Sequence, residues 1–112
     1  MSFNSSILHS FNKEDPSGEL VQFLVENFKK VVPTRIEQFV SYLNSNSLQE
    51  AIQEIHAVKN TFANVGGEGA AQFCQSLEDQ LREGKAVEIK GVSKELNQHF
   101  LSVSTSIAQI WN

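Results

Sequence analysis

The sequence has little cysteine, no excess of positive charge and no long hydrophobic run, and each absence excludes a class of protein. Its 112 residues include one cysteine, so no internal disulfide can form and nothing calls for an oxidising compartment. The net charge is −4, whereas a nucleic-acid-binding domain presents a basic stripe to the phosphates. No segment approaches the ~20 apolar residues that cross a bilayer. We therefore expect a cytoplasmic protein that binds neither nucleic acid nor membrane.

Several functional motifs are also missing. The first residues contain neither the basic segment nor the apolar run of a signal peptide. His9 and His99 are interpreted as surface residues, and no two histidines have metal-ligand spacing. The glycines of segment 67–69 follow no predicted strand, so we expect no ATP site there. We also expect no metal and no cofactor of the protein's own. No heptad pattern is sustained, and a monomer is expected.

Apolar residues recur at three- and four-residue spacing along the chain, which predicts amphipathic helices rather than strands. The content of 40% apolar and 20% charged residues is ordinary for a globular protein, and the length suits one domain, residues 1–112. Five stripes are present. Their members are Phe3, Ile7, Leu8 and Phe11; Leu20, Leu24, Phe28, Val31, Val32, Ile36, Phe39, Val40 and Leu43; Leu48, Ala51, Ile55, Val58, Phe62 and Val65; Ala70, Phe73, Cys74, Leu77 and Leu81; and Leu96, Phe100, Val103, Ile107 and Ile110.

Turn and cap residues predict the limits of the first two helices. Asp15–Pro16 is typical of a helix start, since Asp caps free amides and Pro is tolerated in the first turn. The apolar phase from Leu20 to Leu43 continues across Pro33, so we predict one kinked helix rather than two. The turn at residues 44–46 ends it.

Similar signals divide the second half of the chain. Ser47 and Glu50 form a predicted capping box at the start of a third helix, which ends at Gly66–Gly67. Gly84 closes the fourth helix, residues 85–92 are a connector, and Ser93 is a predicted cap for the last helix. The expected fold is all-α: an up-down-up-down antiparallel four-helix bundle with an additional short N-terminal helix.

His56 lies away from the apolar stripe of the third helix. At about 100° per residue, its side chain projects well over 90° from the centre of that stripe, so a partner can reach it. A neutral imidazole is a nucleophile near physiological pH. Lys59 lies one turn on and leans back toward the helix N-terminus, where its ammonium can meet an anionic group at the ring. The pair places a nucleophile beside a cation on an accessible helix face.

The segment 55–67, IHAVKNTFANVGG, resembles the motif of the histidine-phosphotransfer (Hpt) family. The run 70–78, with its Leu-Glu pair, and the helix 21–28 before Pro33 are also similar to that family. The resemblance implies that His56 carries a phosphoryl group, stabilised by Lys59, and that Gly66 and Gly67 complete the motif. It also implies partners that are response-regulator receiver domains or a hybrid sensor histidine kinase, with Mg²⁺ on the receiver. The chain is then a phosphocarrier and not an independent kinase.

Three positions depart from the family pattern. Thr61 and Phe62 stand where the family favours small residues, and Phe62 is expected to pack in the core, so the departure that matters is at position 60. The residue after the motif lysine is usually glycine, and here it is Asn60, which either crowds a docking receiver or donates a hydrogen bond to the phosphoryl oxygens. Asn60 and Ala63 are the expected neighbours of the phosphate. The expected docking surface comprises Ile52, Ile7 and Leu8.

Three further expectations follow. Cys74 is interpreted as buried packing. Glu78 either orients a group near His56 or faces solvent, and the second interpretation is preferred. The alternative to a phosphocarrier is a non-catalytic helical module that docks a receiver or kinase domain without phosphotransfer. Asn60 favours that alternative, and the intact pair of His56 and Lys59 favours the carrier.

Overall fold

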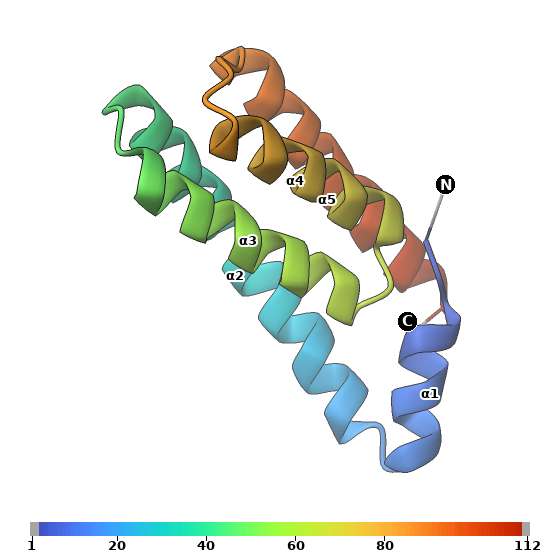
Figure 1. The fold of residues 1–112 in the computed structure, drawn as a ribbon. Coiled ribbons are helices and arrows are strands. Elements are labelled where there is room, and N and C mark those ends of the chain that lie inside the picture. Colours follow the sequence, from blue (N-terminus) through green and yellow to red (C-terminus); the bar gives the residue numbers. More distant parts are fainter. Residues whose placement is uncertain (1–2, 111–112) are drawn as a thin grey trace.

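The computed structural model describes residues 3–110, and these fold into helices without a strand, as Figure 1 shows. The predicted all-α class is confirmed. The expected domain range of 1–112 includes residues 1–2 and 111–112, which lie outside the described residues. The helices are α1 (Ser6–Glu14), α2 (Glu19–Asn44), α3 (Leu48–Asn64), α4 (Glu68–Arg82) and α5 (Ile89–Ile110).

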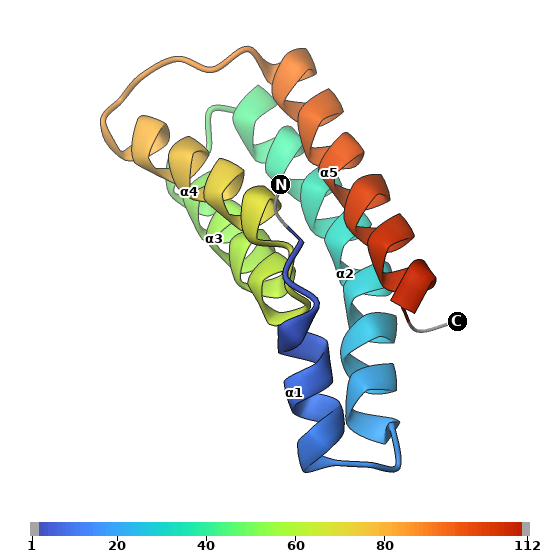
Figure 2. The ribbon, with the colours of Figure 1, turned by 90° about the vertical axis from the view of Figure 1, so that its right-hand side faces the viewer.

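The long helix α2 organises the fold. Its 26 residues span about 39 Å, whereas the 17 residues of α3 span about 26 Å, so the N-terminal part of α2 extends beyond α3. In Figure 2, α1 lies beside that part of α2, and α5 runs along the remainder. Leu8 of α1 and Val21 of α2 are both buried there. The short helix therefore covers an apolar surface that α3 cannot reach.

The core is apolar and continuous along the bundle. Phe28 of α2 packs against Phe62 of α3 and Phe100 of α5, with ring centroids 5.6 and 5.1 Å apart. Helix α3 packs extensively on both α2 and α4, whereas α4 and α5 touch little. Leu48 was predicted to be in the core but is exposed, because it is the first residue of α3 and lies at the end of the bundle. The largest fully buried side chains include Phe28, Phe39, Phe62, Leu8, Ile36, Ile55, Leu96 and Ile107.

Pro33 lies inside α2, so the prediction of a single helix across it is confirmed. The predicted start at Asp15–Pro16 is wrong by a few residues. Asp15 instead ends α1, and its carboxylate accepts hydrogen bonds from the backbone N–H groups of Ser17 and Leu20. These bonds fold the connection between the two helices back on itself before α2 begins at Glu19.

Two other predicted caps are corrected. Ser47 is the N-cap residue of α3, but its hydroxyl bonds to Ser45 Oγ at 3.0 Å and the capping box with Glu50 does not form. Helix α5 begins at Ile89 and not after Ser93. The Glu88 carboxylate accepts the N–H groups of Lys90 and Gly91 and so takes the capping role.

The end of α3 is fastened to the N-terminal segment. The N–H of Asn4 donates to the carbonyl of Gly66 at 2.6 Å, an isolated bridge joins Phe3 to Gly67, and the Asn4 amide donates to Glu68 at 2.9 Å. Gly66 has φ +90°, the left-handed conformation predicted for this helix end. Residues far apart in sequence thus define the turn that leads from α3 into α4.

No helix within residues 3–110 is long and apolar enough to cross a membrane.

Replacing Gly66 with alanine is expected to destabilise the fold strongly. The new Cβ would overlap the carbonyl oxygen of Asn4, in addition to the strain of a positive φ. We expect the free energy of unfolding to fall by about 3 kcal/mol, measured by urea denaturation. Gly84→Ala is the matched control, since Gly84 also has a positive φ (+76°) but a Cβ there meets nothing within 4 Å, so its cost is about 1 kcal/mol. Equal losses for the two variants would show that the N-terminal segment does not constrain Gly66.

Candidate functional site

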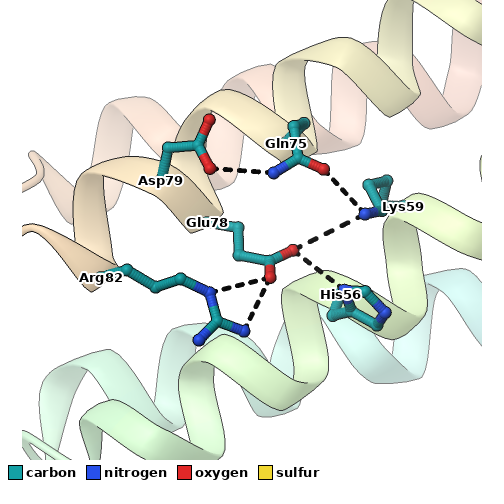
Figure 3. Close-up of polar contacts among 6 residues, drawn as sticks. All are labelled: His56, Lys59, Gln75, Glu78, Asp79 and Arg82. Atoms are coloured by element: carbon teal, nitrogen blue, oxygen red, sulfur yellow. Dashed lines mark hydrogen bonds and ion pairs between the residues drawn. The ribbon is translucent and has the colours of Figure 1, made fainter.

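The structure places His56 on the flank of α3 that faces away from the core. Its side chain is 50% exposed, whereas Ile55 and Val58 on either side of it along the helix are fully buried. The exposed position predicted from the helical pattern is therefore confirmed. One ring nitrogen, Nδ1, points to α4, and Figure 3 shows the other nitrogen directed away from it.

The partner of His56 on α4 is Glu78. The two groups are joined by a hydrogen bond of 3.0 Å between Nδ1 and Glu78 Oε1. The expectation that Glu78 faces solvent is wrong: only 5% of the residue is exposed, the single charged residue that is buried within the described part of the chain. Helical periodicity within α4 does not reveal a partner on α3, 22 residues away. The Leu-Glu pair of the family resemblance was the one available signal.

Arg82 completes the pairing of this buried carboxylate. Its Nε and Nη2 both donate to Glu78 Oε2, at 3.0 and 2.9 Å, while 59% of its side chain remains exposed. Burial by itself raises the pKa of Glu78, but the hydrogen bonds from His56 and Arg82 and the charge of Lys59 outweigh it and lower the pKa below its ordinary value. Glu78 is therefore an ionised acceptor at neutral pH.

The ammonium group of Lys59 lies close to the same Glu78 carboxylate. Its Nζ is 3.8 Å from Glu78 Oε1 and donates a hydrogen bond of 2.8 Å to Gln75 Oε1. Gln75 in turn donates through Nε2 to Asp79 Oδ1 at 2.9 Å. The structure thus brings His56 and Lys59 together, as predicted, and does so through Glu78 and Gln75 of α4, contacts that the periodicity of α3 does not reveal (Figure 3).

The other predicted neighbours lie on the same helix. Ile52, Gln53, His56 and Arg82 line a shallow surface hollow. Asn60 and Ala63 are exposed, and within residues 3–110 the Asn60 side chain has no hydrogen-bond partner. The open side of His56 is therefore bordered by apolar, amide and cationic groups. These groups are chemically compatible with an anionic group on the ring.

The predicted docking contribution of α1 needs correction. Leu8 is fully buried against the core, so it is not available to a partner. Its neighbour Ile7 is only partly buried, and its docking role stays a prediction. Gly66 and Gly67 do not lie at the histidine but form the turn after α3, where Gly67 is closely packed against Phe62 and Val103. Their role is structural.

The remaining candidates do not join the site. Cys74 is buried, as predicted, and this burial raises the pKa of its thiol to about 12, although the charge of Lys59 acts in the opposite direction. His99 is half-buried and stacks on Phe73 with centroids 5.1 Å apart, so it is not a plain surface residue. Residues 3–110 contain no cluster of three or more His, Cys, Asp or Glu side chains that could hold a metal ion.

Comparison with known proteins agrees with this geometry. Residues 24–106, well over half of the chain, match the family model of the Hpt domain. The fold is similar to the crystal structure of histidine-containing phosphotransfer protein B (HptB) from Pseudomonas aeruginosa PAO1, with a TM-score of 0.82 and 20% sequence identity over 96% of this chain and 91% of that chain. No curated protein matches the sequence. The chain belongs to the Hpt family and is a histidine phosphotransfer protein of phosphorelay signalling.

Proposed function

We propose that Nε2 of His56 accepts the phosphoryl group from the aspartyl phosphate of a receiver domain and passes it to the aspartate of another. The observation that carries this assignment is the hydrogen bond between His56 Nδ1 and the buried Glu78 carboxylate. A carboxylate can only accept, so Nδ1 must carry the proton. The lone pair of the neutral ring is then on Nε2, on the exposed side of an imidazole that is 50% accessible.

The transfer step is a displacement at phosphorus. The Nε2 lone pair forms the N–P bond while the P–O bond to the receiver aspartate breaks, and that bond's electron pair returns to the aspartate oxygen. The ring becomes positively charged as the N–P bond forms, and its Nδ1 proton stays in the hydrogen bond to Glu78. The carboxylate therefore stabilises the phosphorylated ring. The reverse sequence delivers the phosphoryl group to a second receiver.

The charges around Glu78 favour an anionic phosphoryl group. The carboxylate contributes one negative charge, and Lys59 and Arg82 contribute two positive charges within hydrogen-bond or ion-pair distance of it. Of these two cations Lys59 is the better shielded from water, with 21% of its side chain exposed, and electrostatic stabilisation is stronger there than in bulk water. Lys59 lies three residues after His56 on the same face of α3, so we assign it to the phosphoryl oxygens.

The partners and the assembly follow from the same proposal. Receiver domains or a hybrid sensor kinase would dock over His56, Ile52, Asn60 and Ala63, with Ile7 at the margin. The receiver would supply Mg²⁺, and this chain would contribute no cofactor of its own. We infer a single-domain monomer in the cytoplasm. The up-down-up-down antiparallel order of α2 to α5 is supported by the turns that join successive helices at alternate ends of the bundle in Figure 1.

His56→Gln is expected to abolish phosphorylation. The test incubates the protein with a ³²P-labelled receiver and Mg²⁺, and the wild type should acquire a label that is labile in acid and stable in alkali. His99→Gln should retain the label, because His99 stacks on Phe73 and lies outside the site. A His56→Gln protein that still takes the label would place the phosphoryl group elsewhere. A receiver that binds the wild type without transfer would favour the non-catalytic docking module, which Asn60 supports.

Asn60→Gly is expected to increase the rate of transfer by about threefold, because the exposed side chain occupies space one turn from His56 where a receiver has to approach. The measurement is single-turnover transfer from a labelled receiver. Asn60→Ala is the companion variant, since it removes the amide while keeping a good helix former. An unchanged rate in both variants would contradict obstruction, and a lower rate in both would also indicate that the amide binds the phosphoryl group.

Glu78→Gln tests the ionised carboxylate through the pH dependence of stability. Because the folded-state pKa of Glu78 lies below its ordinary value of 4.5, its charge stabilises the fold above that pH, and this contribution is lost as pH falls through the lowered pKa. We expect the variant to lose about 2 kcal/mol of unfolding free energy at pH 7, measured by urea denaturation. The difference from wild type should shrink below pH 4.5. A difference that stays constant from neutral to acid pH would show that the charge does not matter.

A further inference from the structure

The ammonium group of Lys59 is held by a chain of side chains on the outer face of α4. Lys59 Nζ donates to Gln75 Oε1 at 2.8 Å, and Gln75 Nε2 donates to Asp79 Oδ1 at 2.9 Å. Both bonds are visible in Figure 3, on the side of Lys59 opposite to His56. Gln75 and Asp79 contact neither His56 nor the exposed side of its ring, so the proposed transfer step assigns them no task.

The chemistry of the three groups fixes which one donates and which one accepts at each step of this hydrogen-bond chain. An ammonium can only donate and a carboxylate can only accept, whereas the amide of Gln75 has one end of each kind. Asp79 accepts a hydrogen bond from the NH₂ group of Gln75, which leaves the Gln75 carbonyl oxygen facing Lys59. Without Asp79 the amide can rotate and present its NH₂ group to the ammonium, where no hydrogen bond forms. Asp79 therefore orients the acceptor that Lys59 uses.

The bond to Gln75 also separates Lys59 from Glu78. At 3.8 Å from Glu78 Oε1, the ammonium is an ion-pair neighbour but too distant for a hydrogen bond. Glu78 Oε1 is the same atom that accepts Nδ1 of His56. Lysine has a long flexible stem, and an ammonium released from Gln75 is drawn by the opposite charge onto this oxygen. There it competes with the imidazole for its acceptor.

We propose that Gln75 and Asp79 are positioning residues for phosphoryl transfer, which hold the Lys59 ammonium ready for the phosphoryl group and prevent it from closing onto Glu78. This inference rests on the proposed role of His56. Its physical basis is pre-organisation: a cation already in place loses less conformational freedom when charge develops on the phosphoryl oxygens. Neither residue touches the reacting atoms, and both act through Lys59.

Gln75→Met removes the acceptor while keeping a side chain of similar length. We expect the single-turnover rate constant at saturating labelled receiver to fall about fivefold, with the half-saturating receiver concentration unchanged. The side-chain ammonium signal of Lys59, observed by ¹H–¹⁵N NMR at low temperature, should broaden or disappear because its proton exchange with water accelerates. Gln72→Met is the matched control on the same helix, since Gln72 is exposed and has no hydrogen-bond partner within residues 3–110. It should leave both readouts unchanged.

A double substitution tests the order of donors and acceptors in the hydrogen-bond chain from Lys59 to Asp79. Gln75→Glu combined with Asp79→Asn conserves the net charge and both hydrogen bonds, because an amide at position 79 can donate to a carboxylate at position 75, which accepts from Lys59. This double variant should recover at least half of the wild-type rate constant and the sharp ammonium signal. Gln75→Met should have no additional effect on the rate in a Lys59→Met background, because the two residues act as one unit.

The outcomes separate this inference from the proposed function. A Gln75→Met protein with the wild-type rate constant and an unchanged ammonium signal would overturn the inference. A further loss of rate in the Lys59→Met background would also overturn it, since Gln75 would then act through something other than Lys59. If the wild type takes no label at all, the proposed function fails, and the ammonium signal alone decides whether Gln75 holds Lys59.

Discussion

The site depends on one electrostatic constraint, the burial of the Glu78 carboxylate between α3 and α4. A buried charge is stable only when it is paired and hydrogen-bonded. Here the imidazole of His56, the guanidinium of Arg82 and the ammonium of Lys59 meet that requirement together. Because two of these partners are on α3 and one is on α4, the carboxylate fixes the register of the two helices. The same contacts that satisfy Glu78 orient the histidine.

This arrangement links stability to reactivity. In the proposed transfer, the Nδ1 proton that satisfies Glu78 leaves the lone pair of His56 on Nε2, so the contact that stabilises the buried carboxylate also selects the reactive tautomer. The core residues on either side of His56 along α3, Ile55 and Val58, are fully buried and hold the helix face in place. Under the proposed function, the packed pair of α3 and α4 holds the nucleophile His56 in one orientation toward a docking domain. The chemistry needs positioning and charge, and both come from side chains packed on rigid elements.

Much of this could be predicted from the sequence, for identifiable reasons. The 3.6-residue periodicity placed five helices and put His56 outside the core, because both depend on local geometry alone. The predicted helix starts were less accurate. The carboxylates of Asp15 and Glu88 accept backbone N–H groups, and the sequence did not reveal these bonds because other residues nearby can also cap a helix. Leu8 was assigned to a docking surface because its stripe gave no indication that the protruding end of α2 would cover it.

The sequence by itself determined the helical class, the exposed histidine and the lysine one turn on, since all three follow from spacing within single helices. Tertiary structure decided what those two residues contact. Glu78, Gln75 and Arg82 join the site because α4 packs against α3 in one register, and no periodicity within either helix encodes that register. The tautomer of His56 and the position of Lys59 are therefore properties of the packed helix pair.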